Sequence, residues 1–436
     1  MILPEIFFAQ MKKIFCAEEY EKFFLSFDDP PVRGLRINTL KIKNTHEIVE
    51  KICEKNFEKI CEKNFVPWCN TGFIFSDERP AKSIAYHAGL FYIQEPSAMS
   101  PAEILGANPG HRVLDLCAAP GGKSVQIAGH LNGECVLVSN DASPSRCRAL
   151  VKNLERAGIT NAVVLAEQPK KLAERFREFF DRILVDAPCS GEGMFRRDAD
   201  AVKAYTANKP EACAAVQKEI LRQAARMLKS GGRMVYSTCT FNMIENEDVI
   251  SAFLEKHDDF FLAETKRIFP HEKGEGHFVA LLQKRGERER NENFQAKQTR
   301  NLDFEKFCGE FLDFEFPRGE FVAHGVNLYF QKTPLDLRGL RVARSGWFLG
   351  ECSKGRFVPS QALAMGLRKE QAKFSAELSD ADAKKYLRGE SLHLEFENEN
   401  TKPWILICHD GFPLGWARLV QGRLKNNLPV GWVNKE

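Results

Sequence analysis

Between residues 94 and 284 the chain alternates short apolar runs with longer stretches of helical periodicity. The apolar runs occupy 112–116, 134–139, 162–165, 182–185, 233–236 and 278–283, and the helical stretches occupy 124–131, 145–158, 172–179, about 210–228 and 247–256. Short apolar runs of this kind are typical of strands buried on both faces, and the intervening helices supply crossover connections. The pattern predicts an α/β domain whose parallel sheet is covered by helices on both faces.

Residues 1–93 have a different pattern. Two helix-like stretches at 6–15 and 17–27 precede a strand-like stretch at 35–40, which predicts a small α+β region. Within residues 52–65 the segment ICEKNFEK is followed at once by ICEKNF, a tandem duplication of eight residues. A shift of eight residues does not keep a helical face in register, so we interpret the duplication as a tolerated extension.

The C-terminal part of the chain restarts after a charged stretch. Residues 285–301 contain many charged side chains and no periodicity, which favours a solvated linker. Residues 302–436 carry short strand-like stretches separated by Gly and Pro and predict a second, more β-rich unit. We therefore expect the segments 1–93, 94–284, 285–301 and 302–436.

Composition excludes several classes of protein. The chain has 436 residues and 44% hydrophobic content, enough for two or three domains. Its 62 Lys and Arg nearly balance 59 Asp and Glu, so a polyanion would have to bind a local basic patch. The first residues do not resemble a signal peptide, and no apolar run is long enough to span a membrane. None of the 13 cysteines lies in a C-x-x-C pair, which indicates reduced thiols in a cytoplasmic protein.

Candidate chemistry lies at the ends of predicted strands. Residues 115–124 form a glycine-rich turn that ends in Gly-Lys-Ser, but Cys117 stands where a phosphate loop needs its first glycine, and a Gly-x-Gly-x-x-Gly turn is absent. Downstream lie Asp186-Ala187-Pro188-Cys189 and Ser237-Thr238-Cys239. A thiolate can add to an electron-poor ring carbon, so these motifs indicate covalent chemistry on a nucleobase, with two cysteines for separate attack and release.

Long motifs make a family resemblance visible. CAAPGGKS, DAPCSGEG and YSTCTFNMIENE resemble the Nop/Sun family of RNA cytosine-C5 methyltransferases, and LRINTL, YIQEPSAM, GEGHF and the stretch from Gly415-Trp416 to Pro429 are similar to its bacterial 16S ribosomal RNA branch. The resemblance implies a Rossmann-like class I methyltransferase domain, S-adenosylmethionine as cofactor, and 16S ribosomal RNA near the decoding site as substrate. Two alternatives stay open: the same reaction on transfer RNA, and a catalytically silent RNA-binding assembly factor.

The resemblance also implies the cofactor site. It places S-adenosylmethionine over Cys117, Ala118, Ala119, Pro120, Gly121, Gly122 and Lys123. Asp141 follows the second predicted strand, where a carboxylate either binds ribose hydroxyls or caps the next helix; the residues alone leave this open, and the resemblance favours the ribose. Gln168 stands near the adenine position, where many relatives have Asp, and Asp186 also borders the cofactor.

The catalytic roles are carried over from the family motifs. By resemblance, Cys239 attacks C6 of cytosine and Cys189 helps to release the product. Asp186 is expected at the N3/N4 edge of the base, and Lys123 is expected close to the base. Cys239 must be deprotonated more readily than a free thiol, whose pKa is about 8.5.

A further set of residues is expected at the RNA or in ordering loops: Arg36, Asn38, Arg196, Arg197, Lys203 and His277. Arg196 and Arg197 are the strongest candidates, since phosphate contacts position a substrate. His271 and His277 lack further metal ligands, so we expect no metal. Trp416, Arg418, Arg423 and Lys425 favour a PUA-like RNA-binding module, although Trp416 fits a core position nearly as well. We expect a monomer.

Overall fold

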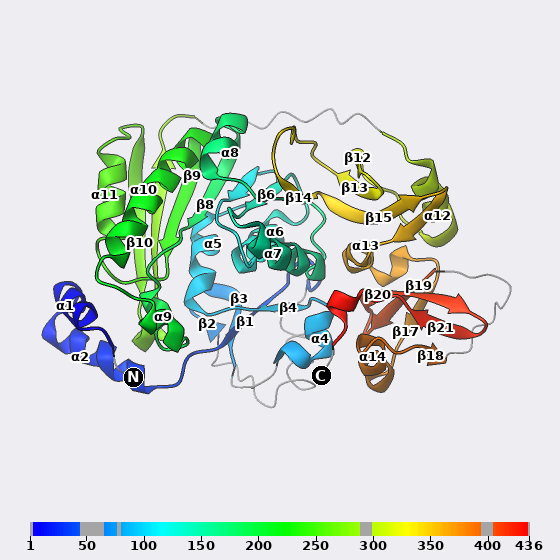
Figure 1. Ribbon diagram of the computed structural model, residues 1–436, viewed down its shortest axis with the longest axis horizontal. Helices are drawn as coiled ribbons and strands as arrows, with labels where there is room; N and C mark the ends of the chain where they lie inside the picture. The colour runs from blue at the N-terminus through cyan, green and yellow to red at the C-terminus, as the bar shows by residue number, and fades with distance from the viewer. Residues whose placement is uncertain (1–2, 44–64, 76–79, 288–298, 394–403, 435–436) are drawn as a thin grey trace.

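The computed structural model describes residues 3–43, 65–75, 80–287, 299–393 and 404–434. The duplicated stretch lies outside these residues except for Phe65. A central sheet of eight strands, in the order β10-β11-β9-β8-β5-β6-β7-β14, forms the methyltransferase-like part of the molecule (Figure 1). This sheet with its helices confirms the predicted Rossmann-like α/β fold.

The middle of the sheet is parallel, as predicted. Its strands are β5 (Val113–Asp115), β6 (Leu137–Asn140), β7 (Ala162–Leu165), β8 (Phe180–Asp186) and β9 (Leu228–Thr238). The helices are α5 (Ser100–Leu105), α6 (Gly122–Leu131), α7 (Pro144–Arg156), α8 (Pro169–Arg175), α9 (Ala199–Lys203), α10 (Lys209–Met227) and α11 (Glu247–Leu254). Proline near the first position starts α7, α8 and α10, because its fixed φ suits the first helical turn.

Both edges of the sheet are antiparallel, so the prediction of a wholly parallel sheet is wrong there. β11 (His277–Lys284) runs antiparallel to β9, and β10 (Phe260–Ile268) runs antiparallel to β11. At the other edge β14 (Val342–Ser345) pairs antiparallel with β7. β10 is half-exposed, and its short apolar run at 260–263 is followed at once by charged residues, whereas β14 comes from a distant part of the chain.

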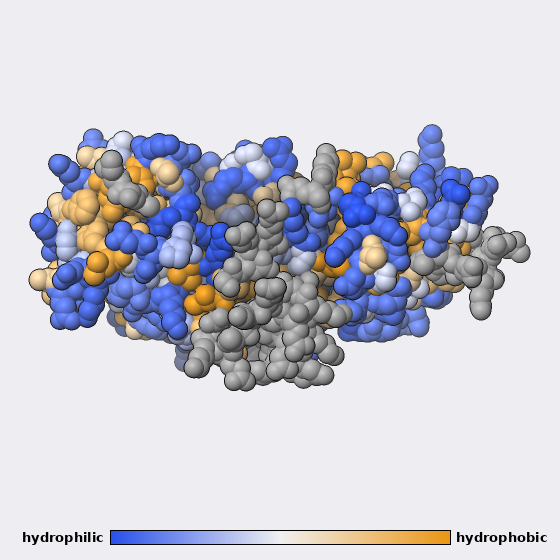
Figure 2. Space-filling model, turned by 90° about the horizontal axis from the view of Figure 1, so that it is seen from below, coloured by the Kyte–Doolittle hydropathy of each residue, from blue (hydrophilic) through white to orange (hydrophobic). Residues whose placement is uncertain are grey.

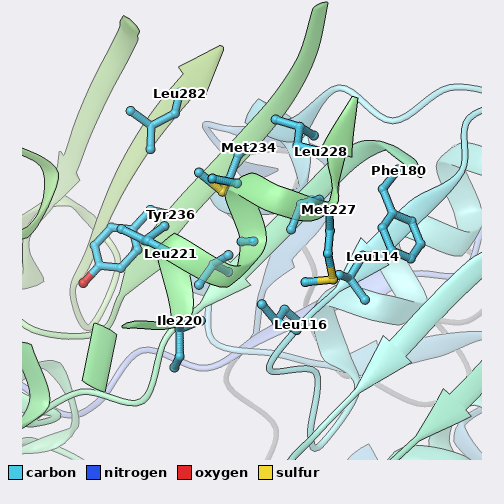
Figure 3. Close-up of a cluster of buried hydrophobic side chains, with 14 of the residues drawn as sticks. Leu114, Leu116, Phe180, Ile220, Leu221, Met227, Leu228, Met234, Tyr236 and Leu282 are labelled. Atoms are coloured by element: carbon cyan, nitrogen blue, oxygen red, sulfur yellow. The ribbon is translucent and has the colours of Figure 1, made fainter. Parts of the chain in front are cut away.

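Alternate residues of the parallel strands supply two separate apolar cores. Leu114 packs on one face with residues of α10, and its neighbour Val113 packs on the other with α6 and α7. Figure 3 shows the first core, where Leu114 and Leu116 lie near Phe180, Met227 and Met234. This alternation explains why each strand reads as a continuous apolar run.

The N-terminal region is α+β, as predicted. Helices α1 (Glu5–Ile14) and α2 (Ala17–Leu25) precede a four-stranded sheet of β2 (Phe65–Val66), β3 (Cys69–Ile74), β1 (Gly34–Ile37) and β4 (Phe91–Ile93), with α4 (Ile84–His87) between β3 and β4. The helices pack against loops of the domain that contains the central sheet: the Phe7 and Phe195 ring centroids are 5.2 Å apart, as are those of Phe23 and Phe241.

The C-terminal region is β-rich, as predicted, and contains two sheets. The first has the order β12-β13-β15-β16 and the second β17-β19-β20-β21-β18. Their bounds are β12 (Glu320–His324), β13 (Asn327–Gln331), β15 (Trp347–Ser353), β16 (Arg356–Pro359), β17 (Ser375–Glu377), β18 (Leu392–His393), β19 (Trp404–His409), β20 (Phe412–Val420) and β21 (Arg423–Asn426), with helices α12 (Leu302–Phe311), α13 (Gln361–Gly366) and α14 (Asp380–Leu387).

Trp416 is a core residue of this region. It is 1% exposed, and its indole Nε1 donates a hydrogen bond to the Ser360 carbonyl. Arg418, Arg423 and Lys425 are exposed. Of the four residues expected in the PUA-like module, the three basic ones therefore lie on the surface of β20 and β21, whereas Trp416 belongs to the core.

The face seen in Figure 2 is largely hydrophilic, with apolar residues in separate patches, as is usual for a surface in contact with water. Among the described residues, none of the helices combines the length and the apolar character that a membrane crossing requires.

Candidate active site

The carboxyl ends of four parallel strands lie along one edge of the central sheet. Asp115 ends β5, Asn140 ends β6, Asp186 ends β8 and Thr238 ends β9. The chain proceeds from β5 outward to β6 and β7 and then returns to β8 on the other side of β5. Ligands of open α/β sheets bind where the strand order reverses in this way. All three sequence motifs follow these strand ends.

The two cysteines of the motifs converge. Cys189 and Cys239 lie on separate loops, after β8 and β9, yet their Sγ atoms are 3.3 Å apart. Both are free thiols. The loops meet because Asp186 and Ser237 are paired on adjacent parallel strands. Contact with Cys239 and burial raise the pKa of the Cys189 thiol well above its ordinary value, so Cys189 is protonated at neutral pH.

An ion pair lies beside the thiols. Asp186 Oδ2 accepts a hydrogen bond from Lys123 Nζ at 2.7 Å, and Oδ1 accepts one from Ser237 Oγ at 2.8 Å. Burial alone would raise the pKa of Asp186, but the charge of Lys123 and the contact with His277 outweigh it and lower this pKa below its ordinary value. Asp186 is therefore an ionised acceptor at neutral pH.

His277 has a loop-ordering role. It is buried, with Nδ1 3.1 Å from Ser97 Oγ and Nε2 3.5 Å from Lys123 Nζ. Ser97 Oγ donates in turn to Glu95 Oε2 at 2.5 Å. Sequence reasoning missed Glu95 and Ser97 as site residues; their only signal was membership of the YIQEPSAM segment. Glu95 and Ser97 therefore connect to Lys123 through His277.

Asp115 was also missed. It is fully buried at the end of β5, and its Oδ2 accepts a hydrogen bond from Ser124 Oγ at 2.7 Å. Burial raises the pKa of Asp115 to about 7, and the nearby charge of Asp186 adds to this increase. The signal available in the sequence was its position at the end of a strand beside the glycine-rich turn.

A cavity of about 700 Å³ opens between these loops and α10, within the range typical of small-molecule sites. Its lining includes the predicted cofactor residues Cys117, Ala119, Asp141, Gln168 and Asp186, together with both cysteines. A second cavity of about 1010 Å³ shares Cys117, Ala119 and Asp186 with the first. The second cavity is also lined by Ala118, Pro120, Gly122 and Lys123. Gly121, at the cap position before α6, has φ 116°, a conformation that favours glycine.

The Asp141 carboxylate fits a ligand with hydroxyl groups. It is 3% exposed; Oδ1 accepts a hydrogen bond from the Ser143 amide at 3.0 Å, and Oδ2 lies 3.1 Å from Arg146 Nη1. Ser143, not Asp141, occupies the cap position of α7. The simple helix-cap interpretation of Asp141 is therefore wrong, and the buried Oδ2 at the cavity wall retains capacity to accept a hydroxyl proton.

Gln168 and Glu167 have different surroundings. Gln168 is exposed, precedes α8 and lines the cavity. The Glu167 carboxylate is buried and accepts hydrogen bonds from the Arg341 amide at 2.9 Å and Lys171 Nζ at 3.0 Å. Of these two neighbours, Gln168 is the one positioned to face a ligand.

Three residues expected at the RNA or in loop ordering are buried and have the second role. Arg36 donates hydrogen bonds to Gln94, to Gln126 and to the Gly122 carbonyl, so it supports the start of α6. Asn38 Nδ2 donates to the carbonyls of Gly89 and Ala157, each at 2.8 Å. Arg196 donates to the carbonyls of Asp29 and Pro30. All three side chains are buried, and these hydrogen bonds are made within the protein.

Arg197 and Lys203 are exposed. Arg197 lines the larger cavity, whereas Lys203 lies on α9 and pairs with Asp200 at 2.9 Å. Among the residues that the structure describes, no group of three or more His, Cys, Asp or Glu side chains is arranged to hold a metal ion.

Comparison with known proteins identifies the family of the chain. The family model of the 16S rRNA methyltransferase RsmB/F matches residues 102–290, and the model of the RsmF N-terminal domain matches residues 3–96. The models of the RsmF first C-terminal domain and the RsmF PUA domain match residues 306–367 and 373–434. The ribosomal RNA small subunit methyltransferase F of Erwinia tasmaniensis is 31% identical, over 98% of this chain and 96% of its own. The chain belongs to this methyltransferase family.

Other relatives support membership of the ribosomal RNA small subunit methyltransferase F family. The enzyme of that name from Vibrio campbellii is 32% identical over 98% of this chain and 97% of its own. Among solved structures, a methyltransferase homolog protein from Pyrococcus horikoshii is 30% identical, with a TM-score of 0.55 over 61% of this chain and 91% of its own. Family membership implies a methyl-donor cofactor of the S-adenosylmethionine type and an RNA substrate.

Proposed function

We propose that this protein transfers a methyl group from S-adenosylmethionine to C5 of a cytosine in 16S ribosomal RNA. The observation that carries the proposal is the 3.3 Å distance between the Cys189 and Cys239 Sγ atoms, on the wall of a cavity that also contains Asp141. RNA binding alone needs no paired thiols, so a silent assembly factor would leave this arrangement unexplained. The proposal implies a cytoplasmic protein, because bacterial ribosomal RNA is made there.

The cofactor would be held by residues of the smaller cavity and the adjoining turn. In this proposal Asp141 binds the ribose hydroxyls, Gln168 faces the adenine, and the turn from Cys117 to Lys123 approaches the methionine portion. When bound, S-adenosylmethionine supplies an electrophilic methyl group. The small side chains of Ala118 and Ala119 leave room for close approach of a ligand to the backbone.

Cys239 makes the base reactive. C5 of cytosine is a weak nucleophile until a thiolate adds to C6. Addition forms an S–C6 bond and moves the electron pair of the C5–C6 double bond toward C5 and N3; N3 takes up the proton that the Cys239 thiol gives up, and it returns this proton when the thiolate leaves. Asp186 is ionised and accepts hydrogen bonds from the N4 amino group and the protonated N3. Lys123 holds Asp186 in position through their 2.7 Å contact.

Cys189 assists the release step. After methyl transfer the C5 proton leaves to a base or to water, the S–C6 bond breaks, and the C5–C6 double bond is restored. Because the pKa of Cys189 is raised, its thiol carries a proton and can donate a hydrogen bond to the departing Cys239 thiolate.

Bisulfite sequencing of ribosomal and transfer RNA from a deletion strain tests the function. Loss of one or more 5-methylcytidines from 16S ribosomal RNA, restored by the wild-type chain and not by Cys239→Ala, is the expected result. Loss confined to transfer RNA would favour the alternative substrate. An unchanged methylation pattern would leave only the assembly factor.

Covalent trapping tests the division of roles between the thiols. Cys189→Ala is expected to form the C6 adduct and to methylate, but to expel the product slowly, so that a denaturation-resistant complex of protein and RNA accumulates. The complex should disappear in the double variant Cys189→Ala/Cys239→Ala. Failure of Cys189→Ala to trap a substrate that it binds would contradict the release role.

A further inference from the structure

Two buried carboxylates connect the cysteine loops to each other. Glu192 lies three residues after Cys189, and Glu245 lies six residues after Cys239. Both side chains are 0% exposed. Each carboxylate accepts hydrogen bonds from the backbone of the opposite loop, so the connection is reciprocal.

Glu192 holds the backbone next to Cys239. Its Oε2 accepts hydrogen bonds from the amides of Phe241 at 2.7 Å and Asn242 at 3.0 Å. Its Oε1 accepts one from Tyr205 Oη at 2.7 Å. The segment after the proposed nucleophile is therefore fixed from the loop of the other cysteine.

Glu245 holds the backbone next to Cys189. Its Oε2 accepts hydrogen bonds from the Ser190 amide at 2.9 Å and from Gln217 Nε2 at 2.8 Å. Gln217 Nε2 also donates to the Pro188 carbonyl at 2.9 Å. The peptide groups on both sides of Cys189 are thus connected, directly or through Gln217, to a residue from the loop of Cys239.

The space between the two carboxylates is bridged as well. Asn242 Nδ2 lies 3.0 Å from Glu192 Oε1 and 2.8 Å from Glu245 Oε1. The Gly193 amide donates to the Cys239 carbonyl at 2.9 Å. These contacts leave little freedom for one loop to move without the other.

We propose that Glu192 and Glu245 are positioning residues with crossed assignments: Glu192 sets the Cys239 thiol for attack, and Glu245 sets the Cys189 thiol for release. The inference rests on the proposed function. Each glutamate lies in the loop of one cysteine and controls the other cysteine. A displacement of a reacting group by about 1 Å can cost on the order of 100-fold in rate.

Substitution by glutamine tests the crossed assignment with little change in volume. All the groups that bind Glu245 are donors, so Glu245→Gln leaves an amide N–H facing a donor, and the Cys189 segment should loosen. In Glu192→Gln the new amide also faces a donor, Asn242 Nδ2, but it can donate to Tyr205 Oη, while one oxygen remains for the Phe241 and Asn242 backbone amides. The Cys239 segment should therefore loosen less severely.

Single-turnover methylation of a 16S ribosomal RNA fragment separates the two steps. Glu245→Gln should accumulate the covalent complex, as Cys189→Ala does, with methyl transfer within roughly threefold of wild type. Glu192→Gln should methylate roughly tenfold or more slowly and should not accumulate the complex. The S-adenosylmethionine Kd should stay within about twofold of wild type in both variants.

A matched control lies at the start of β8, the strand whose other end leads into the Cys189 loop. Asp181 is also fully buried and accepts a hydrogen bond from the Arg112 amide at 2.7 Å, far from the cysteines. Asp181→Asn should lower stability without changing the ratio of trapped complex to methylated product. If Glu245→Gln does not fold, Gln217→Leu provides a milder change in the same direction, with a smaller accumulation of the complex.

The outcomes discriminate between this inference and the proposed function. Equal slowing of methyl transfer and of product release in both glutamate variants would overturn the crossed assignment. A change in the ratio of trapped complex to methylated product in Asp181→Asn would overturn it too. Suppose that wild type methylates the fragment and Cys189→Ala traps it, while neither glutamate variant changes the ratio of trapped complex to methylated product. In that case only the positioning inference fails. If wild type and Cys189→Ala show no activity on any cytosine, the proposed function fails instead.

Discussion

At the scale of single residues, chemical identity and position at a strand end carry most of the functional argument. Cys189, Cys239, Asp186 and Lys123 were predicted as a group, and the structure brings them together. The distance between the two thiols could not be predicted, because it depends on the pairing of β8 with β9 and on the two glutamates that connect the loops.

Cys239→Ala should abolish methyl transfer and leave S-adenosylmethionine binding nearly intact, because the thiol attacks the base and does not hold the cofactor. Incorporation of labelled methyl groups into RNA retained on a filter measures methyl transfer, and calorimetry measures S-adenosylmethionine binding. Full activity in Cys239→Ala, with loss of activity in Cys189→Ala, would reverse the assignment of the nucleophile.

Asp141→Ala should weaken S-adenosylmethionine binding by roughly 1 to 3 kcal/mol, the usual cost of leaving buried hydroxyl groups without a partner. Calorimetric titration of the purified variant provides the measurement. Lys203→Ala is a suitable control, because Lys203 is exposed and pairs only locally with Asp200. Unchanged affinity in Asp141→Ala would assign Asp141 to ordering the Ser143 turn.

Asp115 should make stability depend on pH. Its pKa is raised to about 7 by burial, whereas the unfolded chain ionises this group near its ordinary value of 3.8. Between these two pKa values the folded state binds a proton on Asp115 that the unfolded chain has lost. The stability contributed by protonated Asp115 is therefore lost as pH rises toward 7. Asp115→Asn should gain free energy of unfolding relative to wild type, on the order of 1 to 4 kcal/mol, between about pH 5 and about pH 8. Urea titrations without cofactor would measure it, and a pH-independent difference would contradict it.

At the scale of elements, local pattern predicted the parallel strands and their helices well. The edges were missed for two physical reasons. β10 is half-exposed, so its apolar positions are diluted by charge, and β14 pairs with β7 from more than a hundred residues away. Boundaries shifted by a few residues where a proline or a cap, not the apolar pattern, starts the helix.

Gly193→Ala should separate the two catalytic loops. A Cβ at this position would lie 2.9 Å from the Gly276 carbonyl oxygen and 3.0 Å from that of Cys239, so backbone would have to move. We expect a loss of roughly 1 to 3 kcal/mol in stability together with slower methylation. Gly309→Ala is the matched control: it lies in α12 with nothing within 4 Å, and should be neutral or slightly stabilising. Urea denaturation and single-turnover rates would show both effects.

At the scale of the whole molecule, the C-terminal region is part of the methyltransferase sheet. β14 covers the edge of β7, and Arg341 just before it donates hydrogen bonds to Glu167, the neighbour of Gln168 in the wall of the smaller cavity. Figure 1 shows β14 extending from the C-terminal region to the central sheet. The linker therefore separates segments of sequence that the sheet joins again.

A chain that ends at residue 284 should consequently aggregate or unfold more easily, although it contains the predicted methyltransferase segment. It would expose the edge of β7, whose four residues are buried in the full chain. A chain that ends at residue 372 loses Trp404 and Trp416 from the C-terminal core but retains β14, so the edge of β7 stays covered and this fragment should aggregate less than the shorter one. Light scattering and thermal unfolding of the two fragments would test this, and equal behaviour would show that β14 is dispensable.

The sequence by itself determined the chemistry and the general fold. Apolar periodicity is a local property, and the cysteine, lysine and aspartate motifs keep their meaning wherever the strands end. Only the tertiary structure decided that Arg36, Asn38 and Arg196 are buried supports, that Trp416 is a core residue, and that Glu192 and Glu245 cross between the cysteine loops. Each of these features depends on which distant backbone groups meet, and an amino-acid pattern along one segment carries no information about that pairing.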